Sequence, residues 1–90
     1  MKTQTESRQA ILSSVLRRFS EHEFTIHRTL ETDQTFVDLC EELAVAEAAL
    51  ANVDQFPPTV RSERRAEWQD IVERLLKEIE VALQEKRRPG

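Results

Sequence analysis

Glycine, cysteine and aromatic residues are scarce in this chain of 90 residues, which has one Gly, one Cys, one Trp and no Tyr. A single glycine argues against a turn-rich sandwich or barrel and against a glycine loop that binds phosphate. A single cysteine excludes a disulfide framework and a zinc site built on cysteines. No apolar run approaches the ~20 residues that span a bilayer. The length suits one domain with a modest core.

What the sequence does contain is charge and regularly spaced apolar residues. Charged residues make up 33% of the chain and hydrophobic residues 39%, and the apolar residues recur every three or four positions, as in amphipathic helices. The net charge of −4 argues against a dedicated nucleic-acid binder. The spacing predicts an all-α fold, with helices at about residues 5–18, 21–31, 34–52 and 61–87.

The junction at Ser20 predicts the start of the second helix near Glu21. Ser20 is followed three residues later by Glu23, which is the spacing of a capping box. Phe19 and Phe24 have the spacing of a hydrophobic staple around the same cap.

The two later helices have their own boundary signals. Asp33 is predicted to cap the third helix, because its carboxylate can accept from free backbone N–H groups. Pro57 and Pro58 end that helix. Thr59 or Ser62 is predicted to cap the last helix.

Two apolar stripes run along the third predicted helix. The first has heptad spacing and comprises Phe36, Leu39, Leu43, Ala46, Leu50 and Val53. The second is made mostly of small residues: Val37, Cys40, Ala44, Ala48 and Ala51. The last helix carries a matching stripe of Trp68, Val72, Leu75, Ile79 and Ala82. These stripes predict a long antiparallel helical hairpin, with the N-terminal helices packed across it.

The apolar faces predict that the chain completes its bundle as a homodimer or higher homo-oligomer. They exceed what one hairpin of this size covers, and the last helix is longer than the third. Small domains often complete their core by oligomerisation. The expected interface residues are Val37, Cys40, Ala44, Ala48, Trp68, Leu76 and Leu83. The leading hypothesis is therefore a non-enzymatic protein–protein interaction module.

Charge is distributed unevenly between the segments. Four basic residues and one acidic residue give residues 1–19 a net charge of +3, whereas residues 36–56 carry five acidic residues and no basic one. Cations at the start of the last helix oppose its dipole, which suggests a docking site for an acidic partner or phosphate at Arg61, Arg64 and Arg65. The acidic helix of the same chain or of a second copy is the more economical partner.

An alternative function is a nucleic-acid or anionic-surface binder that uses this cluster together with Lys86, Arg87 and Arg88. A second alternative treats residues 1–18 as a targeting or membrane-surface helix.

The sequence gives little support for catalysis or metal binding. His22 and Glu23 resemble the start of a metalloprotease helix, but the second histidine stands at position 27 rather than 26, so the two rings diverge. The acidic residues Asp38, Glu41, Glu42 and Glu47 lack the histidines of a bundle metal site, and a solvated acidic face is the better interpretation. We expect no enzyme activity, no cofactor and no metal.

Cys40 is predicted to be a small packing residue, because neighbouring acidic residues would raise its thiol pKa. A cross-subunit disulfide formed in vitro is the alternative.

Residues 19–50 resemble the YdcH-like family of small bacterial helical-hairpin proteins of unknown function. The resemblance rests on Phe19, Glu21, His22, Ile26, His27, Arg28, Asp33, Phe36, Leu39, Glu42, Ala46 and Leu50. The chain departs from the family at Ser20, where the family usually has proline, and in its last helix. The resemblance implies a cytoplasmic bacterial helical hairpin and no assigned activity.

Overall fold

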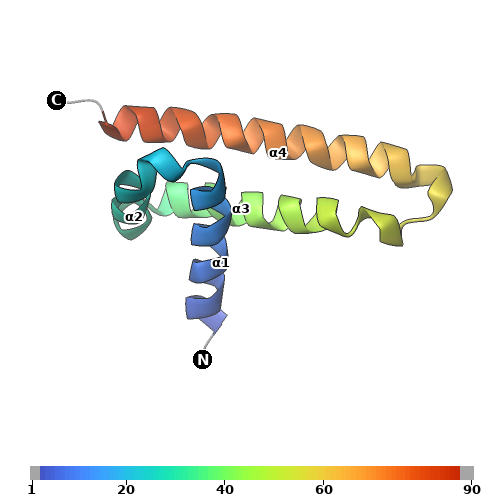
Figure 1. Ribbon diagram of the computed structural model, residues 1–90, viewed down its shortest axis with the longest axis horizontal. Coiled ribbons are helices and arrows are strands. Elements are labelled where there is room, and N and C mark those ends of the chain that lie inside the picture. Colours follow the sequence, from blue (N-terminus) through green and yellow to red (C-terminus); the bar gives the residue numbers. More distant parts are fainter. Residues whose placement is uncertain (1–2, 88–90) are drawn as a thin grey trace.

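The computed structural model describes the backbone of residues 3–87 and the side chains of Gln9 and residues 11–86. Over this range the chain forms the α-helices α1 (Thr3–Arg18), α2 (Glu23–Thr32), α3 (Gln34–Ala51) and α4 (Pro58–Arg87), and the single-turn 3₁₀ helices η1 (Ser20–His22) and η2 (Val53–Gln55). Helices α3 and α4 form an antiparallel hairpin, and α1 crosses it (Figure 1). The all-α prediction and the pairing of the last two long helices are confirmed.

Asp33 links the start of α3 to the end of α4, at the end of the hairpin opposite its loop. Its side chain accepts a hydrogen bond from the backbone N–H of Phe36 at 3.2 Å, which confirms the predicted cap of α3. Its other carboxylate oxygen lies 3.4 Å from Nζ of Lys86, near the end of α4. The bond from Phe36, and secondarily Lys86, hold the pKa of Asp33 below its ordinary value.

The last helix begins earlier than predicted, at Pro58. Proline is favoured at the first helical position because its ring fixes a helical φ and the missing N–H has no partner there in any case. The backbone N–H of Val60 bonds to the carbonyl of Pro57 at 3.0 Å. The predicted caps Thr59 and Ser62 are therefore wrong, since both residues lie inside α4.

The capping box at Ser20 and the staple between Phe19 and Phe24 are also not formed. The chain instead turns through η1, and neither η1 nor α2 receives a side-chain cap. Because α2 begins at Glu23, Phe24 is its second residue and is 72% exposed. The ring of Phe19 packs edge-on against His22, with 6.4 Å between the centroids.

All four α-helices contribute to one core. Its buried members are Ile11, Val15, Ile26, Leu30, Phe36, Val37, Cys40, Leu43, Ala46, Val72, Leu75, Ile79 and Leu83. Helix α1 packs against α3, and the guanidinium of Arg18 donates two hydrogen bonds to Glu47, at 2.7 and 3.1 Å. Two members of the second stripe of α3, Val37 and Cys40, are thus buried within the single chain, although the sequence predicted that they contact a second copy.

Helix α4 has 30 residues and α3 has 18, so the hairpin arms differ in length by about 18 Å. The additional length of α4 contacts α2 at one end and η2 at the other. The chain itself therefore supplies the partner that we expected α4 to find elsewhere. The molecule remains elongated, with extents of 51 × 32 × 20 Å.

Candidate functional site

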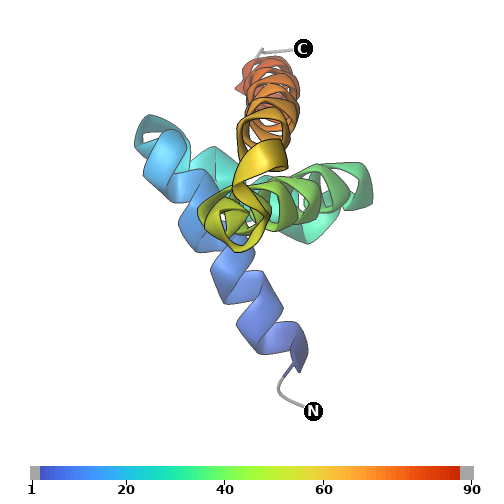
Figure 2. The ribbon, with the colours of Figure 1, turned by 90° about the vertical axis from the view of Figure 1, so that its right-hand side faces the viewer.

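A groove with an apolar middle lies between α3 and α4. We call it the hairpin groove. Its volume is about 560 Å³, and it is lined by Asp38, Glu41, Glu42, Val45, Ala46, Trp68, Ile71, Arg74 and Leu75. No lining residue comes from α1 or α2, and Figure 2 shows α1 running below α3, on the side away from α4. The groove is the side of the hairpin that the N-terminal helices leave open.

The middle of the hairpin groove is apolar. Ala46 and Leu75 are buried at its floor, and Trp68 and Ile71 are half-buried. Val45 is 64% exposed. Single exposed valines are common on protein surfaces, but here the exposed valine lines the same concave surface as a half-buried tryptophan, which is typical of a binding site.

The rim of the groove is charged. Asp38, Glu41 and Glu42 line the α3 side, and Arg74 lines the α4 side, 3.9 Å from Glu78. One turn before Trp68, Arg64 lies on the same face of α4, and its Nη1 donates to Glu67 at 2.7 Å. The groove therefore carries acidic charge at one end and a basic side chain beyond the other.

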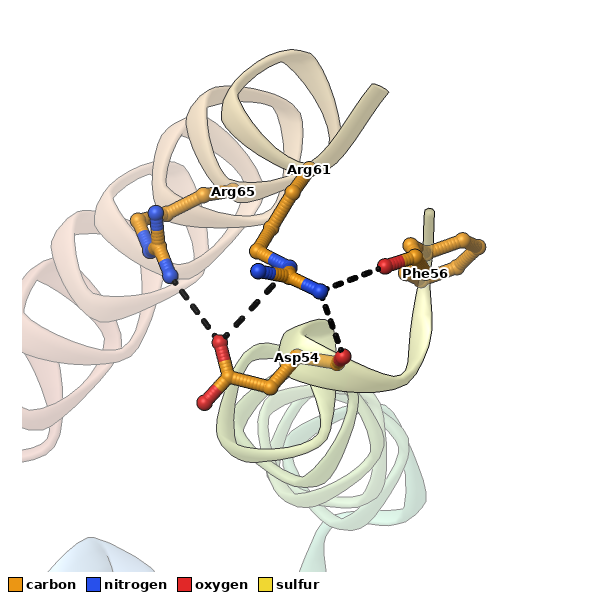
Figure 3. Close-up of polar contacts among 4 residues, drawn as sticks. All are labelled: Asp54, Phe56, Arg61 and Arg65. Carbon is orange, nitrogen blue, oxygen red and sulfur yellow. Dashed lines mark hydrogen bonds and ion pairs between the residues drawn. The ribbon is translucent and has the colours of Figure 1, made fainter. Parts of the chain in front are cut away.

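The predicted arginine cluster is divided by the fold. Nη2 of Arg61 donates to the carbonyl oxygens of Asp54 and Phe56, both at 3.0 Å, and Nη2 of Arg65 lies 3.4 Å from Oδ1 of Asp54 (Figure 3). These two arginines close the connection between α3 and α4. Arg64 does not line the groove itself, but it lies one turn before Trp68 on α4 and pairs with Glu67. Cations at the start of α4 interact unfavourably with its dipole. The carbonyl groups of Asp54 and Phe56 and the carboxylate of Asp54 offset this effect.

The second basic cluster, at the end of α4, is also partly paired with an acidic residue of the same chain. Lys86 pairs with Asp33. The side chain of Arg87 and the whole of Arg88 lie outside the described residues.

The structure separates the seven residues expected at an interface. Val37, Cys40 and Leu83 are buried in the core of the single chain, so they do not form an exposed surface. Ala44 and Leu76 are half-buried, and Leu76 lies beside Phe19 in a shallow depression on the other side of α4. Ala48 is exposed. Trp68 alone among the seven lines the hairpin groove.

The sequence analysis missed Val45 as a groove residue. A signal was present, since Asp38, Glu41, Glu42 and Val45 share one face at helical spacing. The pattern places one exposed valine at the end of an acidic stripe.

The sulfur of Cys40 has no access to solvent, because the side chain is 0% exposed. Burial, with a smaller contribution from Glu41, raises the pKa of the thiol to about 12. A protonated, enclosed thiol is a poor nucleophile. This placement agrees with the packing role and leaves no route to a disulfide without local unfolding.

The two histidines lie apart in their contacts. Nε2 of His27 is 4.0 Å from a carboxylate oxygen of Glu23, whereas His22 packs on Phe19. Across the described residues, no three His, Cys, Asp or Glu side chains gather as a metal ion would require.

No protein-family model, curated protein or solved structure matches this chain. The resemblance to the YdcH-like family therefore stays an expectation drawn from the sequence. Within residues 3–87, none of the helices has the length and apolar character needed to cross a bilayer.

Proposed function

We propose that this protein is a non-enzymatic protein–protein interaction module that acts as a homo-oligomer, and that a partner helix docks in the hairpin groove. The observation that carries the proposal is the exposure of Val45 beside Trp68 and Ile71 in a groove open to solvent. Apolar grooves between helices are the usual receptors for amphipathic helices. Tryptophan is enriched among the residues that dominate such interfaces.

The exposed area of the chain supports the proposal. The chain exposes 6600 Å², whereas a compact monomer of 10.5 kDa exposes about 5,400 Å². A standard interface buries about 800 Å² on each partner. Association of that size would bring the exposed area per chain close to the ordinary value.

The test is the mass of the full chain in solution, measured by sedimentation equilibrium at micromolar concentrations. We expect a mass above that of the monomer for the wild type. Val45→Glu should reduce the mass to that of the monomer, because the new carboxylate would have to be buried against an apolar partner. Glutamate is also a better helix former than valine, so the substitution favours the fold of α3.

Phe24→Glu is the matched control. It also adds a carboxylate at an exposed apolar side chain, but on α2, outside the groove. A wild-type chain that sediments as a monomer throughout, or a Val45→Glu variant with the wild-type mass, would contradict the proposal.

The only tryptophan of the chain gives a second measurement at the same site. Docking of a partner over Trp68 should shift its fluorescence emission to shorter wavelength as the protein concentration rises. The shift should be absent in Val45→Glu and present in Phe24→Glu.

The alternative function, binding of nucleic acid or an anionic surface, has less support. Arg61, Arg65 and Lys86 pair with acidic groups of their own chain, and these pairs would have to break to bind phosphate. A mobility-shift titration with duplex DNA and single-stranded RNA, at low and moderate salt, tests it. A shift that salt weakens steeply would favour the alternative, because counterion release dominates phosphate binding.

A further inference from the structure

We infer that the occupant of the hairpin groove is a second copy of this chain, packed antiparallel so that Asp38 and Glu41 of each protomer meet Arg64 of its partner. The inference rests on the proposed function and specifies its partner and register. It follows from the way charge is arranged along the groove.

The two ends of the groove are identified by the ion pairs of the hairpin. Lys86 pairs with Asp33 at one end, and Arg65 pairs with Asp54 at the other. Asp38 and Glu41 lie toward the first end. Arg64, at the start of α4, lies toward the loop end, on the face of Trp68 and Ile71. Opposite charges therefore lie at opposite ends of one apolar surface.

The positions of these charges are symmetric about the middle of the groove. Asp38 precedes Val45 by seven residues on α3, and Arg64 precedes Ile71 by seven residues on α4. At 1.5 Å per residue, each charge lies about 10 Å from the apolar centre, in opposite directions because the helices are antiparallel.

A two-fold axis that lies in the plane of the interface, passes through the apolar centre and is perpendicular to the line from Asp38 to Arg64 places the acidic end of one protomer against the basic end of the other. Such an interface uses the same patch twice, as in most homodimers. Val45 and Ile71 of the two protomers then face each other, and two charge clusters flank them. The guanidinium of Arg64 has enough donors to keep Glu67 while it meets a carboxylate of the partner.

The same arrangement disfavours a uniformly charged helix in the groove. A basic helix would meet Arg64 and Arg74, and an acidic helix would meet Asp38, Glu41 and Glu42. A reversed copy of this surface matches both signs.

The experiment exploits the two-fold symmetry. In a homodimer of either variant, both charge clusters change. Asp38→Lys places a lysine beside Glu41 against Arg64 and weakens the attraction, and Arg64→Glu sets a carboxylate against Asp38 and Glu41 and makes the clusters repulsive. Each variant alone should dimerise about tenfold more weakly than the wild type. Mixed in equal amounts, the two variants should form a heterodimer with near wild-type affinity. In that pair the introduced lysine meets the introduced glutamate at one cluster, and the unchanged Arg64 and Asp38 meet at the other. Sedimentation equilibrium measures all three dissociation constants.

Glu31→Lys is the charge control, because Glu31 is exposed on α2 and does not line the groove. It should leave the dissociation constant unchanged. Circular dichroism of each variant confirms that the helices are intact. Single variants that associate like the wild type, or a mixture that stays dissociated, would overturn the inferred register.

These outcomes are separate from those of the proposed function. Val45→Glu could abolish association while the single charge variants dimerise like the wild type or their mixture stays dissociated. In that case the groove is the interface and the register is different. If the wild type is a monomer, both proposals fail.

Discussion

Asp33 and Lys86 form an ion pair with 3.4 Å between Oδ2 and Nζ, although 53 positions separate them in the sequence. The same carboxylate caps α3 through the N–H of Phe36. One side chain therefore serves a local role, which the sequence predicted, and a long-range role that it did not.

Replacement of Asp33 should separate these two roles. Asp33→Ala removes both the cap and the ion pair and should lower the melting temperature by several degrees. Asp33→Asn should have a smaller effect, because asparagine is also a good cap. Thermal denaturation followed by circular dichroism measures both variants. Equal melting temperatures for Asp33→Ala and the wild type would contradict the assigned cap.

The pH dependence of stability should carry a contribution from Asp33. Its pKa in the folded chain lies below the ordinary value of 3.8. A lowered pKa means that the contribution is complete above pH 3.8 and is lost as the pH falls through the folded pKa. NMR titration of the Asp33 carboxyl carbon should give the lowered value, and urea denaturation of Asp33→Asn should lack this part of the acid sensitivity.

Arg61→Ala should destabilise the fold by about 1–2 kcal/mol, because the carbonyls of Asp54 and Phe56 each lose a charge-assisted hydrogen bond. Arg65→Ala should cost less than about 1 kcal/mol, since its pair with Asp54 is exposed. Urea denaturation compares the two variants. Arg61→Lys should recover only part of the loss, because an ammonium group lacks the planar fork of the guanidinium.

Cys40 should resist thiol reagents while the chain is folded. The side chain is inaccessible, and its pKa is raised to about 12, so almost no thiolate forms at neutral pH. A chromogenic thiol reagent should react slowly with the native protein and rapidly in urea. Cys40→Ser should cost about 1–3 kcal/mol, because it buries a hydroxyl in an apolar site. Rapid reaction of the native protein would contradict the burial of Cys40.

The sequence predicted those features that depend on neighbours along the chain. The apolar spacing located the helical segments, and the carboxylate of Asp33 identified the start of α3. The failures occurred where a local signal competed with tertiary packing. Ser20 has a good capping pattern, but the chain must turn between α1 and α2 there, and backbone bonds in η1 replace the side-chain cap.

The candidate site was predicted less well than the fold. Apolar spacing does not tell which of two stripes the same chain will cover, so Val37 and Cys40 were assigned to a partner although the core of the single chain buries them. Nor does spacing show that Arg61 and Arg65 lie within reach of Asp54. Trp68 was identified because tryptophan is enriched at the centres of interfaces.

The position of α1 has a consequence for proteolysis. Helix α1 packs against α3 and contributes Ile11 and Val15 to the core, so a chain cleaved between α1 and α2 would expose a second apolar surface on the hairpin. We expect such a fragment to aggregate more readily than the intact chain, because exposed apolar patches favour association. The first helix thus covers apolar surface of the hairpin while contributing no residue to the groove.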